Sequence, residues 1–289
     1  MNRIGIVADD FSSATDCGVQ FCAAGIETCA YMAGETRFSE GIGTLSLDTD
    51  SRECTPEEAY ARTLAGARAL ADRGVEQVYK SVDSTLRGNL GAEIDAVMDA
   101  FGFSAALIAP AFPLYGRTTQ AGIHFLNGVP IAQSSISRDP TRPVRESEMV
   151  RVLAAQSGRA AARLSLETVR GGEASVCREI ARLQRAGTAF FVPDVEREED
   201  LAILARVSAR LPEVLCVGST GLARHVATAW TAETGASPKG IPLVSGAMLV
   251  VAGSAAQLTG AQIAKDLLDG TVGRVKIDPV SAIESGQNP

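Results

Sequence analysis

The chain has 289 residues, which is long enough for one large domain or two ordinary ones. Hydrophobic residues make up 46% of it and charged residues 21%, a balance typical of globular proteins. The formal net charge of −7, without any lysine- or arginine-rich run, argues against a nucleic-acid partner. No apolar run approaches the length of a membrane span, so no membrane partner is expected.

The first predicted strand, residues 4–8, carries the most informative motif. It places Asp9 and Asp10 at its carboxyl end, and Ser12 and Ser13 follow where a helix is expected to begin. Ligands of open α/β sheets bind outside the carboxyl ends of the strands, so this acidic pair suits a bound cation or a polyhydroxylated substrate. The alternative is that one aspartate only caps the helix.

Strand and helix patterns then alternate along the chain. This alternation predicts an α/β fold, with a mostly parallel sheet and helices on both faces. Residues 116–143, rich in Gly, Pro, Ser and Thr, predict an irregular excursion or a small hairpin. Strands are predicted over 26–32, 44–48, 75–79, 105–109, 188–192 and 214–217, and helices from 55 and over 91–101, 174–186, 198–211 and 222–230.

A composition change near residue 234 predicts a domain boundary. We expect a first domain over 1–233, a linker over 234–246 and a second α/β unit over 247–289. The second unit shows a strand pattern at 248–252, a helix pattern at 257–268 and a strand pattern at 272–277. One such unit cannot bury both faces of a sheet, so this domain is expected to be incomplete.

Further polar clusters also follow predicted strands. Arg52 comes after strand 44–48 and Arg117 after strand 105–109, although each could be a surface arginine. The cluster after strand 75–79 combines cations, which suit a carboxylate, with carboxylate and amide groups, which suit hydroxyls. Its members are Lys80, Asp83, Ser84, Arg87 and Asn89. We expect Asp10, Arg52, Lys80, Asp83 and Arg87 to converge on one cleft, the alternative for the loop being a solvated turn.

Several kinds of site are disfavoured. The chain has two histidines, His124 and His225, far apart in sequence, which disfavours a histidine-based metal site, and no metal ligands are predicted. Neither a GxGxxG motif after a strand nor a P-loop is present. Two Gly-Ser turns, at 218–221 and 253–254, open predicted helices and could present backbone N–H groups to an anion. Six cysteines without CxxC pairing, and a strand close to Met1 that predicts no signal peptide, indicate a reduced, cytoplasmic protein.

The motif ADDFSSATD at 8–16 resembles the ADDFTGATD signature of the four-carbon acid sugar kinases. The resemblance continues in order over almost the whole chain and implies ATP-dependent phosphorylation of a terminal hydroxyl, with Mg²⁺ on the phosphates. D-threonate, D-erythronate and 3-oxo-tetronates are the substrates it implies, held by an N-terminal domain while a C-terminal domain holds ATP. The other matching segments are KSVDSTLRGNLGAEID, PAFPLYGRTTQAGIHFLNGVPI, SRDPTRPVRESEM, VGSTGLARHVA and VVAGSAAQLTGAQI.

The resemblance also implies site residues. Gly253 and Ser254 match a turn that contacts ATP, and the stretch at 138–147 is closer to the threonate and erythronate kinases than to the 3-oxo-tetronate branch. Either Asp10 or Asp83 could orient or deprotonate the attacking hydroxyl, and the sequence does not choose between them. The positions matching substrate pocket motifs are Asp10, Arg52, Lys80, Asp83, Ser84, Arg87, Asn89 and Arg117.

Three departures from the family pattern affect these expectations. Ser12-Ser13 replaces Thr-Gly, and Ala255-Ala256 replaces small polar residues beside Ser254. Family members also continue well past residue 289, so we expect a C-terminally truncated member with weak ATP binding and impaired turnover. One alternative is a non-catalytic sugar-acid-binding module. Another is an unrelated hydrolase or isomerase with Ser84 as nucleophile, which lacks a nearby histidine in the sequence. A homo-oligomer is possible.

Overall fold

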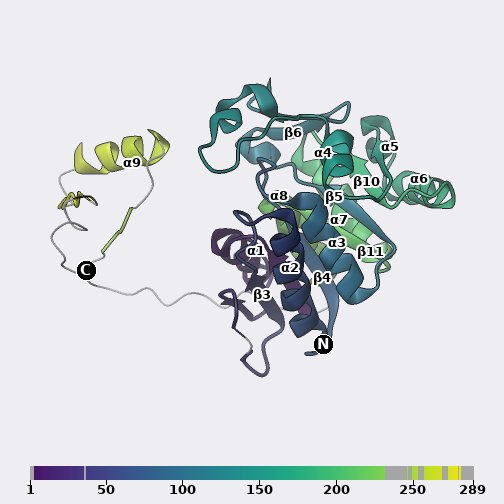
Figure 1. Cartoon of the computed structure of the whole chain (residues 1–289), viewed down its shortest axis with the longest axis horizontal. Helices are drawn as coiled ribbons and strands as arrows, with labels where there is room; N and C mark the ends of the chain where they lie inside the picture. Colours follow the sequence, from purple (N-terminus) through teal and green to yellow (C-terminus); the bar gives the residue numbers. More distant parts are fainter. Residues whose placement is uncertain are drawn as a thin grey trace. The chain divides into compact units, whose positions relative to one another are not determined.

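The computed structural model divides the chain into two compact units, Met1–Lys239 and Gly240–Pro289 (Figure 1). Each unit is considered by itself. The residues that the structure describes are 3–35, 37–231, 246, 249–252, 257–268, 273–278 and 280.

The first unit is built on an eight-stranded sheet in which every neighbouring pair is parallel. Its strand order is β2-β3-β1-β4-β11-β5-β10-β9, so β1 lies between two strands that follow it in sequence. The mostly parallel α/β fold expected from the sequence is confirmed. The strands are β1 Arg3–Ala8, β2 Thr28–Tyr31, β3 Thr44–Asp48, β4 Val75–Ser81, β5 Ala105–Ala109, β9 Ala161–Leu164, β10 Phe190–Pro193 and β11 Val214–Gly218.

Helices cover both faces of this sheet and bury a separate hydrophobic cluster on each (Figure 1). One cluster takes Phe21 from α1 and Val226 from α8, and the other takes Leu70 from α2 and Ile94 from α3. The first layer contains α1 Phe11–Ala23, α5 Leu166–Arg170, α6 Glu173–Arg185, α7 Glu198–Arg210 and α8 Thr220–Thr231. The second contains α2 Pro56–Ala71, α3 Leu90–Phe101 and α4 Met149–Gln156.

Local sequence signals account for the helix ends next to the sheet. Thr55 and Glu58 form a reciprocal capping box at the start of α2, with Pro56 in the first turn. Gly102 ends α3 with a φ of +77°, a left-handed conformation that glycine adopts readily. The segment over 149–170, which contains α4, β9 and α5, was not predicted because its elements are short and weakly periodic.

The excursion after β5, predicted as irregular or as a small hairpin, contains a β6–β7 hairpin that β8 extends to a small antiparallel sheet. It contains β6 Arg117–Gln120, β7 Ile123–Leu126 and β8 Val129–Pro130. The short 3₁₀ helices η1 Pro113–Tyr115, η2 Ile131–Gln133 and η3 Ser135–Arg138 flank it. Backbone bridges from Thr119 to Val195 and from Ile123 to Glu148 attach this small sheet to the rest of the first unit. These bridges fix its position there.

In the second unit, α9 Gln257–Leu268 agrees with the predicted helix. The two predicted strands are wrong over their described parts, because residues 249–252 and 273–278 form no strand and are exposed. A strand needs a neighbour to satisfy its backbone groups, and the described residues of this unit provide none. Gly253, Ser254 and most of the predicted linker lie outside the described residues. Within the described chain, no helix has the length and apolar character that crossing a membrane requires.

Candidate functional site

Most of the predicted site residues lie at or just after the ends of β1, β3 and β4, which are adjacent in the sheet. Because these strands are parallel, their carboxyl ends meet at one edge. Asp9 and Asp10 leave β1 there, and the loop that carries Arg52 leaves β3 beside them. The backbone N–H groups of Ser51 and Arg52 both donate to the carbonyl of Asp9, at 3.0 and 3.1 Å.

Arg52 is held by both aspartates. Its Nε and Nη2 donate to the two carboxylate oxygens of Asp9 at 2.7 and 2.9 Å, and its Nη1 donates to Asp10 at 2.5 Å. Nη2 also donates to the Ser13 hydroxyl at 3.0 Å. Burial by itself would lower the pKa of Arg52, but the hydrogen bonds and charge of Asp9 raise it above its ordinary value. With 12% of its side chain exposed, Arg52 keeps few donors for a ligand.

Asp10 has both a structural and a possible chemical role. It is the N-cap of α1, and its Oδ1 accepts from the Ser13 N–H at 2.7 Å. The alternative interpretation of the acidic motif, that an aspartate caps the helix, therefore describes one role of Asp10. However, 31% of the Asp10 side chain is exposed, against 2% for Asp9, so Asp10 is the member of the pair that a ligand can reach.

Lys80 does not face the site directly. It lies within β4 and is fully buried, with its Nζ 2.8 Å from Glu93 Oε2 and 2.5 Å from the carbonyl of Ser81. Burial raises the pKa of Glu93, with a contribution from the charge of Asp9, whereas Lys80 opposes the rise. The structure thus brings Asp10, Arg52, Asp83 and Arg87 together, whereas Lys80 lies beneath them.

Asp83 and Arg87 form a second ion pair after β4. Asp83 Oδ2 accepts from Arg87 Nε and Thr85 Oγ1, both at 2.6 Å, and from the Arg87 N–H at 3.2 Å. Burial by itself would raise the pKa of Asp83, but Arg87 and the nearby charge of Arg52 hold it below its ordinary value. Among the described residues, no hydrogen bond reaches Asp83 Oδ1. Asp83 is therefore an ionised carboxylate with one oxygen available.

Gly88 brings the two ion pairs together. It has a φ of +93°, and a Cβ built on it would lie 3.3 Å from Asp9 Oδ2 and 3.4 Å from Arg52 Cγ. A larger residue would be strained by its backbone conformation and would press on the Asp9–Arg52 pair. The absence of a side chain at Gly88 lets the loop after β4 lie directly on this pair.

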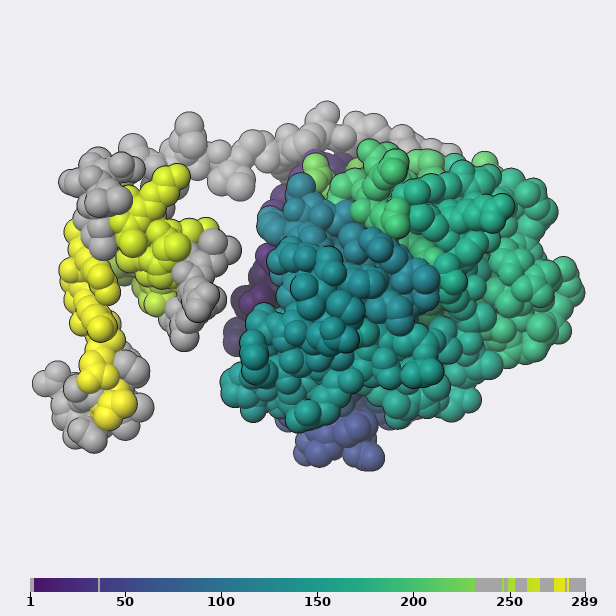
Figure 2. All heavy atoms as spheres, turned by 90° about the horizontal axis from the view of Figure 1, so that it is seen from above, coloured from purple at the N-terminus to yellow at the C-terminus, as the bar shows by residue number. Residues whose placement is uncertain are grey.

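Arg117, at the start of β6, adds an arginine with unused donors. Its Nη1 donates to the carbonyl of Tyr115 at 2.9 Å, and its guanidinium lies 5.6 Å from the centre of the Tyr115 ring. Its buried Nε has no hydrogen-bond partner within the described structure. Burial lowers the pKa of Arg117, while the charge of Asp83 partly opposes this. In Figure 2 the blue-green to teal part of the chain, to which β6 belongs, forms much of the visible face of the first unit.

Two other predicted residues have mainly structural contacts. Asn89 is buried and donates from Nδ2 to the carbonyls of Ser51 and Cys54 at 3.1 and 3.0 Å, so it ties the loop after β3 to the start of α3. Ser84 is partly buried, and its carbonyl accepts from the ring of His124.

A histidine distant in sequence does lie beside Ser84, but it contacts the Ser84 carbonyl and not the hydroxyl. His124 Nε2 lies 2.9 Å from the Ser84 carbonyl, and its Nδ1 lies 3.0 Å from Thr119 Oγ1. Burial lowers the pKa of His124 to about 4, so the ring is neutral at pH 7. A carbonyl only accepts, so Nε2 carries the proton and Nδ1 accepts from Thr119. Neither nitrogen bonds the Ser84 hydroxyl, and the geometry gives no support to a serine nucleophile.

Sequence reasoning missed Glu93, Ser51, Ser13 and His124. Glu93 is an acidic residue in the first turn of α3, where its neighbours along the helix are buried. An acidic residue among apolar ones could have indicated from the sequence that Glu93 has a specific role. His124 gave no signal, because its contacts join β7 to the loop after β4, 40 residues away.

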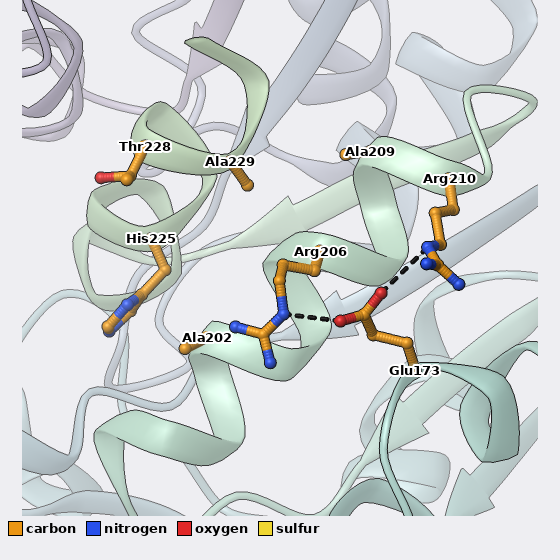
Figure 3. Close-up of a pocket in the computed structure, with 8 residues that line it drawn as sticks. All are labelled: Glu173, Ala202, Arg206, Ala209, Arg210, His225, Thr228 and Ala229. Carbon is orange, nitrogen blue, oxygen red and sulfur yellow. Dashed lines mark hydrogen bonds and ion pairs between the residues drawn. The ribbon is translucent and has the colours of Figure 1, made fainter. Parts of the chain in front are cut away.

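The described cavities lie elsewhere. One of about 450 Å³ lies between α6, α7 and α8 and contains the Glu173 carboxylate, which pairs with Arg206 at 2.6 Å and Arg210 at 2.9 Å (Figure 3). His225 also lines it and contacts Glu198 at 2.9 Å. Both regions contain paired charges, but the sheet edge gathers charged side chains from the loops after β1, β3 and β4. Among the described residues it also has Asp83 Oδ1 and Arg117 Nε without a hydrogen-bond partner. We therefore take the edge of the sheet as the candidate site.

Comparisons with known proteins show the family of the chain. The family described as sugar-binding N-terminal domain matches residues 4–226, which include the whole site. The chain belongs to this family. The resemblance to four-carbon acid sugar kinases is likewise confirmed by curated relatives. D-threonate kinase of Cupriavidus necator is 38% identical over 263 residues, covering 90% of this chain and 62% of the relative. 3-Oxo-tetronate kinase of Escherichia coli is 33% identical over 271 residues, covering 91% and 69%.

Solved structures share the fold of this chain. A crystal structure of a Salmonella typhimurium LT2 protein has a TM-score of 0.82 at 31% identity, covering 93% of this chain and 65% of that one. A Bordetella bronchiseptica domain of unknown function, a domain-swapped dimer with bound citrate, has a TM-score of 0.71 at 34% identity, covering 80% and 57%. The chain thus spans about three fifths of the length of the Cupriavidus relative.

Proposed function

We propose that the chain binds a four-carbon acid sugar at the Asp10–Arg117 edge of the sheet, as part of an ATP-dependent kinase for its terminal hydroxyl. The observation that carries this proposal is the combination of Arg87 and Arg117, which keep unused guanidinium donors, with the aspartates Asp10 and Asp83. The family match and the relatives named as D-threonate and 3-oxo-tetronate kinases support it. A further relative is named D-erythronate kinase.

The arginines would bind the carboxylate of the sugar acid. The charge of Arg87 helps to lower the pKa of Arg117, and the charge of Asp83 acts on both arginines. A small carboxylate placed between them would receive charge-assisted hydrogen bonds and relieve their repulsion. The citrate bound in the Bordetella relative is a carboxylate ligand of that protein and is compatible with this assignment.

The aspartates would bind the sugar hydroxyls, and one of them would act on the attacking hydroxyl. Asp10 is the more exposed carboxylate, whereas Asp83 Oδ1 is an oxygen to which no described residue donates a hydrogen bond. Bound Mg-ATP would supply the phosphoryl group. Gly253 and Ser254, which the family resemblance relates to ATP, lie outside the described residues, so their role stays a prediction.

Calorimetric titration and an ADP-release assay test the two halves of this proposal separately. We expect D-threonate or D-erythronate to bind, citrate to compete, and erythritol, which lacks the carboxylate, not to bind. Absence of binding by D-threonate, D-erythronate and 3-oxo-tetronate would refute the proposal. Binding without ADP release would favour the alternative, a non-catalytic sugar-acid-binding module.

Replacing each aspartate in turn would identify the base. Asp10→Asn and Asp83→Asn can both retain sugar-acid binding, but only loss of the base should abolish phosphoryl transfer.

The Bordetella relative is a domain-swapped dimer, so we also propose a homo-oligomer, which light scattering would detect. The cytoplasmic location remains a prediction from the cysteine pattern.

A further inference from the structure

Ser51 connects the candidate site to the interior of the fold. Its N–H donates to the Asp9 carbonyl at 3.0 Å, and its carbonyl accepts from Asn89 at 3.1 Å. Its hydroxyl donates to Glu93 Oε1 at 3.0 Å and lies 2.8 Å from Thr49 Oγ1. Every polar group of this fully buried residue therefore has a partner, and three of the partners lie on other segments.

Glu93 provides the fixed end of this connection. It lies in the first turn of α3 and pairs through Oε2 with Lys80 of β4 while Oε1 accepts from Ser51. The side chains of Glu93 and Lys80 are buried, with 2% and 0% of their surface exposed. A buried ion pair of this kind adds little net stability, but it restricts the position of whatever it bonds.

The loop that Ser51 belongs to needs such support. Asp50 has a φ of +46°, a left-handed conformation that a non-glycine residue adopts at a cost. Arg52 is the residue after Ser51, and its guanidinium contacts Asp9 and Asp10 at the same time. A small rotation of the 49–52 backbone would break the Arg52 contact to Asp10 Oδ2 and leave this carboxylate held through Oδ1 alone, by the Ser13 N–H.

We propose that Glu93, held by Lys80, is a positioning residue: through Ser51 it fixes Arg52, and through Arg52 it fixes the ligand-facing carboxylate of Asp10. The proposal rests on the sugar-acid site proposed above. It also assigns Lys80 a role different from the ligand contact that the sequence predicts. The ammonium of Lys80 has no exposed surface, and its described partners are Glu93 and the Ser81 carbonyl.

Ser51→Ala tests the connection, because it removes the hydrogen bond from the loop to Glu93 and leaves the Lys80–Glu93 pair intact. Ser46→Ala is the matched control. Ser46 is equally buried on β3, but its hydroxyl donates at 2.6 Å to the Ala14 carbonyl on the other face. We expect Ser51→Ala to weaken D-threonate or D-erythronate binding about tenfold or more, and Ser46→Ala by about twofold or less, with binding measured well below the melting temperature of each variant.

Hydrogen exchange at Arg52 Nε–H, followed by NMR without any ligand and assigned with Arg52→Lys, gives an independent measurement. We expect this proton to be protected in the wild type and in Ser46→Ala, and to exchange faster in Ser51→Ala. If the wild type binds no sugar acid, the proposed function fails while this measurement still decides the positioning role. Unchanged exchange in Ser51→Ala, or equal loss of affinity in both variants, would overturn the inference.

Discussion

The buried histidine predicts a specific pH dependence of stability, which His124→Gln should remove. His124 has no exposed surface, and its ring bonds the Ser84 carbonyl and Thr119. Glutamine can still donate a hydrogen bond toward the Ser84 carbonyl, but it does not titrate. The variant therefore isolates the protonation of one side chain from the other contacts of the loop after β4.

The magnitude follows from linkage. The pKa of His124 falls from 6.5 to about 4 on folding, mainly because of burial. Between these values the unfolded chain binds more protons than the folded one, so stability is full above pH 6.5 and is lost as pH falls toward 4. The complete loss would be about 3 kcal/mol, and the loss between pH 8 and pH 5 about 2 kcal/mol. Glu93, whose pKa is raised, contributes with the opposite sign in both proteins and cancels in their difference.

Urea unfolding of the wild type and of His124→Gln at several pH values between 5 and 8 measures this difference. The free energy of unfolding of the wild type should fall by about 2 kcal/mol more than that of the variant over this range. His225→Gln is the control, because His225 lies partly exposed beside Glu198. Parallel pH profiles for the wild type and His124→Gln would show that His124 is not held neutral in the fold and would refute the reasoning.

Three further variants test the site. Arg117→Ala should weaken sugar-acid binding about tenfold or more with little change in melting temperature, measured by calorimetric titration, and unchanged affinity would remove Arg117 from the site. Asp9→Asn leaves Arg52 buried without a full counter-charge and should lower the free energy of unfolding by about 3 kcal/mol in urea, whereas a loss below about 1 kcal/mol would contradict the buried-pair argument. Gly88→Ala and Gly74→Ala both place alanine at positive φ, but the Cβ at position 74 would meet no atom within 4 Å. Gly88→Ala should therefore lose about 1 kcal/mol more than Gly74→Ala, and equal losses would show that the close approach to Asp9 is unimportant.

Local signals were sufficient for most of the first unit. The capping box at Thr55 and Glu58, the glycine stop at Gly102 and the short apolar strands set the alternation that made a parallel α/β fold predictable. The same reasoning failed at 249–252 and 273–278, where apolar composition predicted strands. Composition reports the preference of a segment for burial, but a strand exists only where another strand satisfies its backbone groups.

The sequence by itself determined where the candidate site lies, because parallel strands bring their carboxyl ends to one edge, and Asp10, Arg52 and Asp83 each follow a strand. Only the tertiary structure decided what each side chain does there. Lys80 and Arg52 are both cations next to strand ends, yet Lys80 is enclosed by Glu93 and Arg52 by Asp9 and Asp10, leaving Arg87 and Arg117 with free donors. The partners that make this distinction lie on α3 and in the turn between β1 and α1. Electrostatic contacts of a few ångströms between segments far apart in the chain leave no periodic pattern in the sequence.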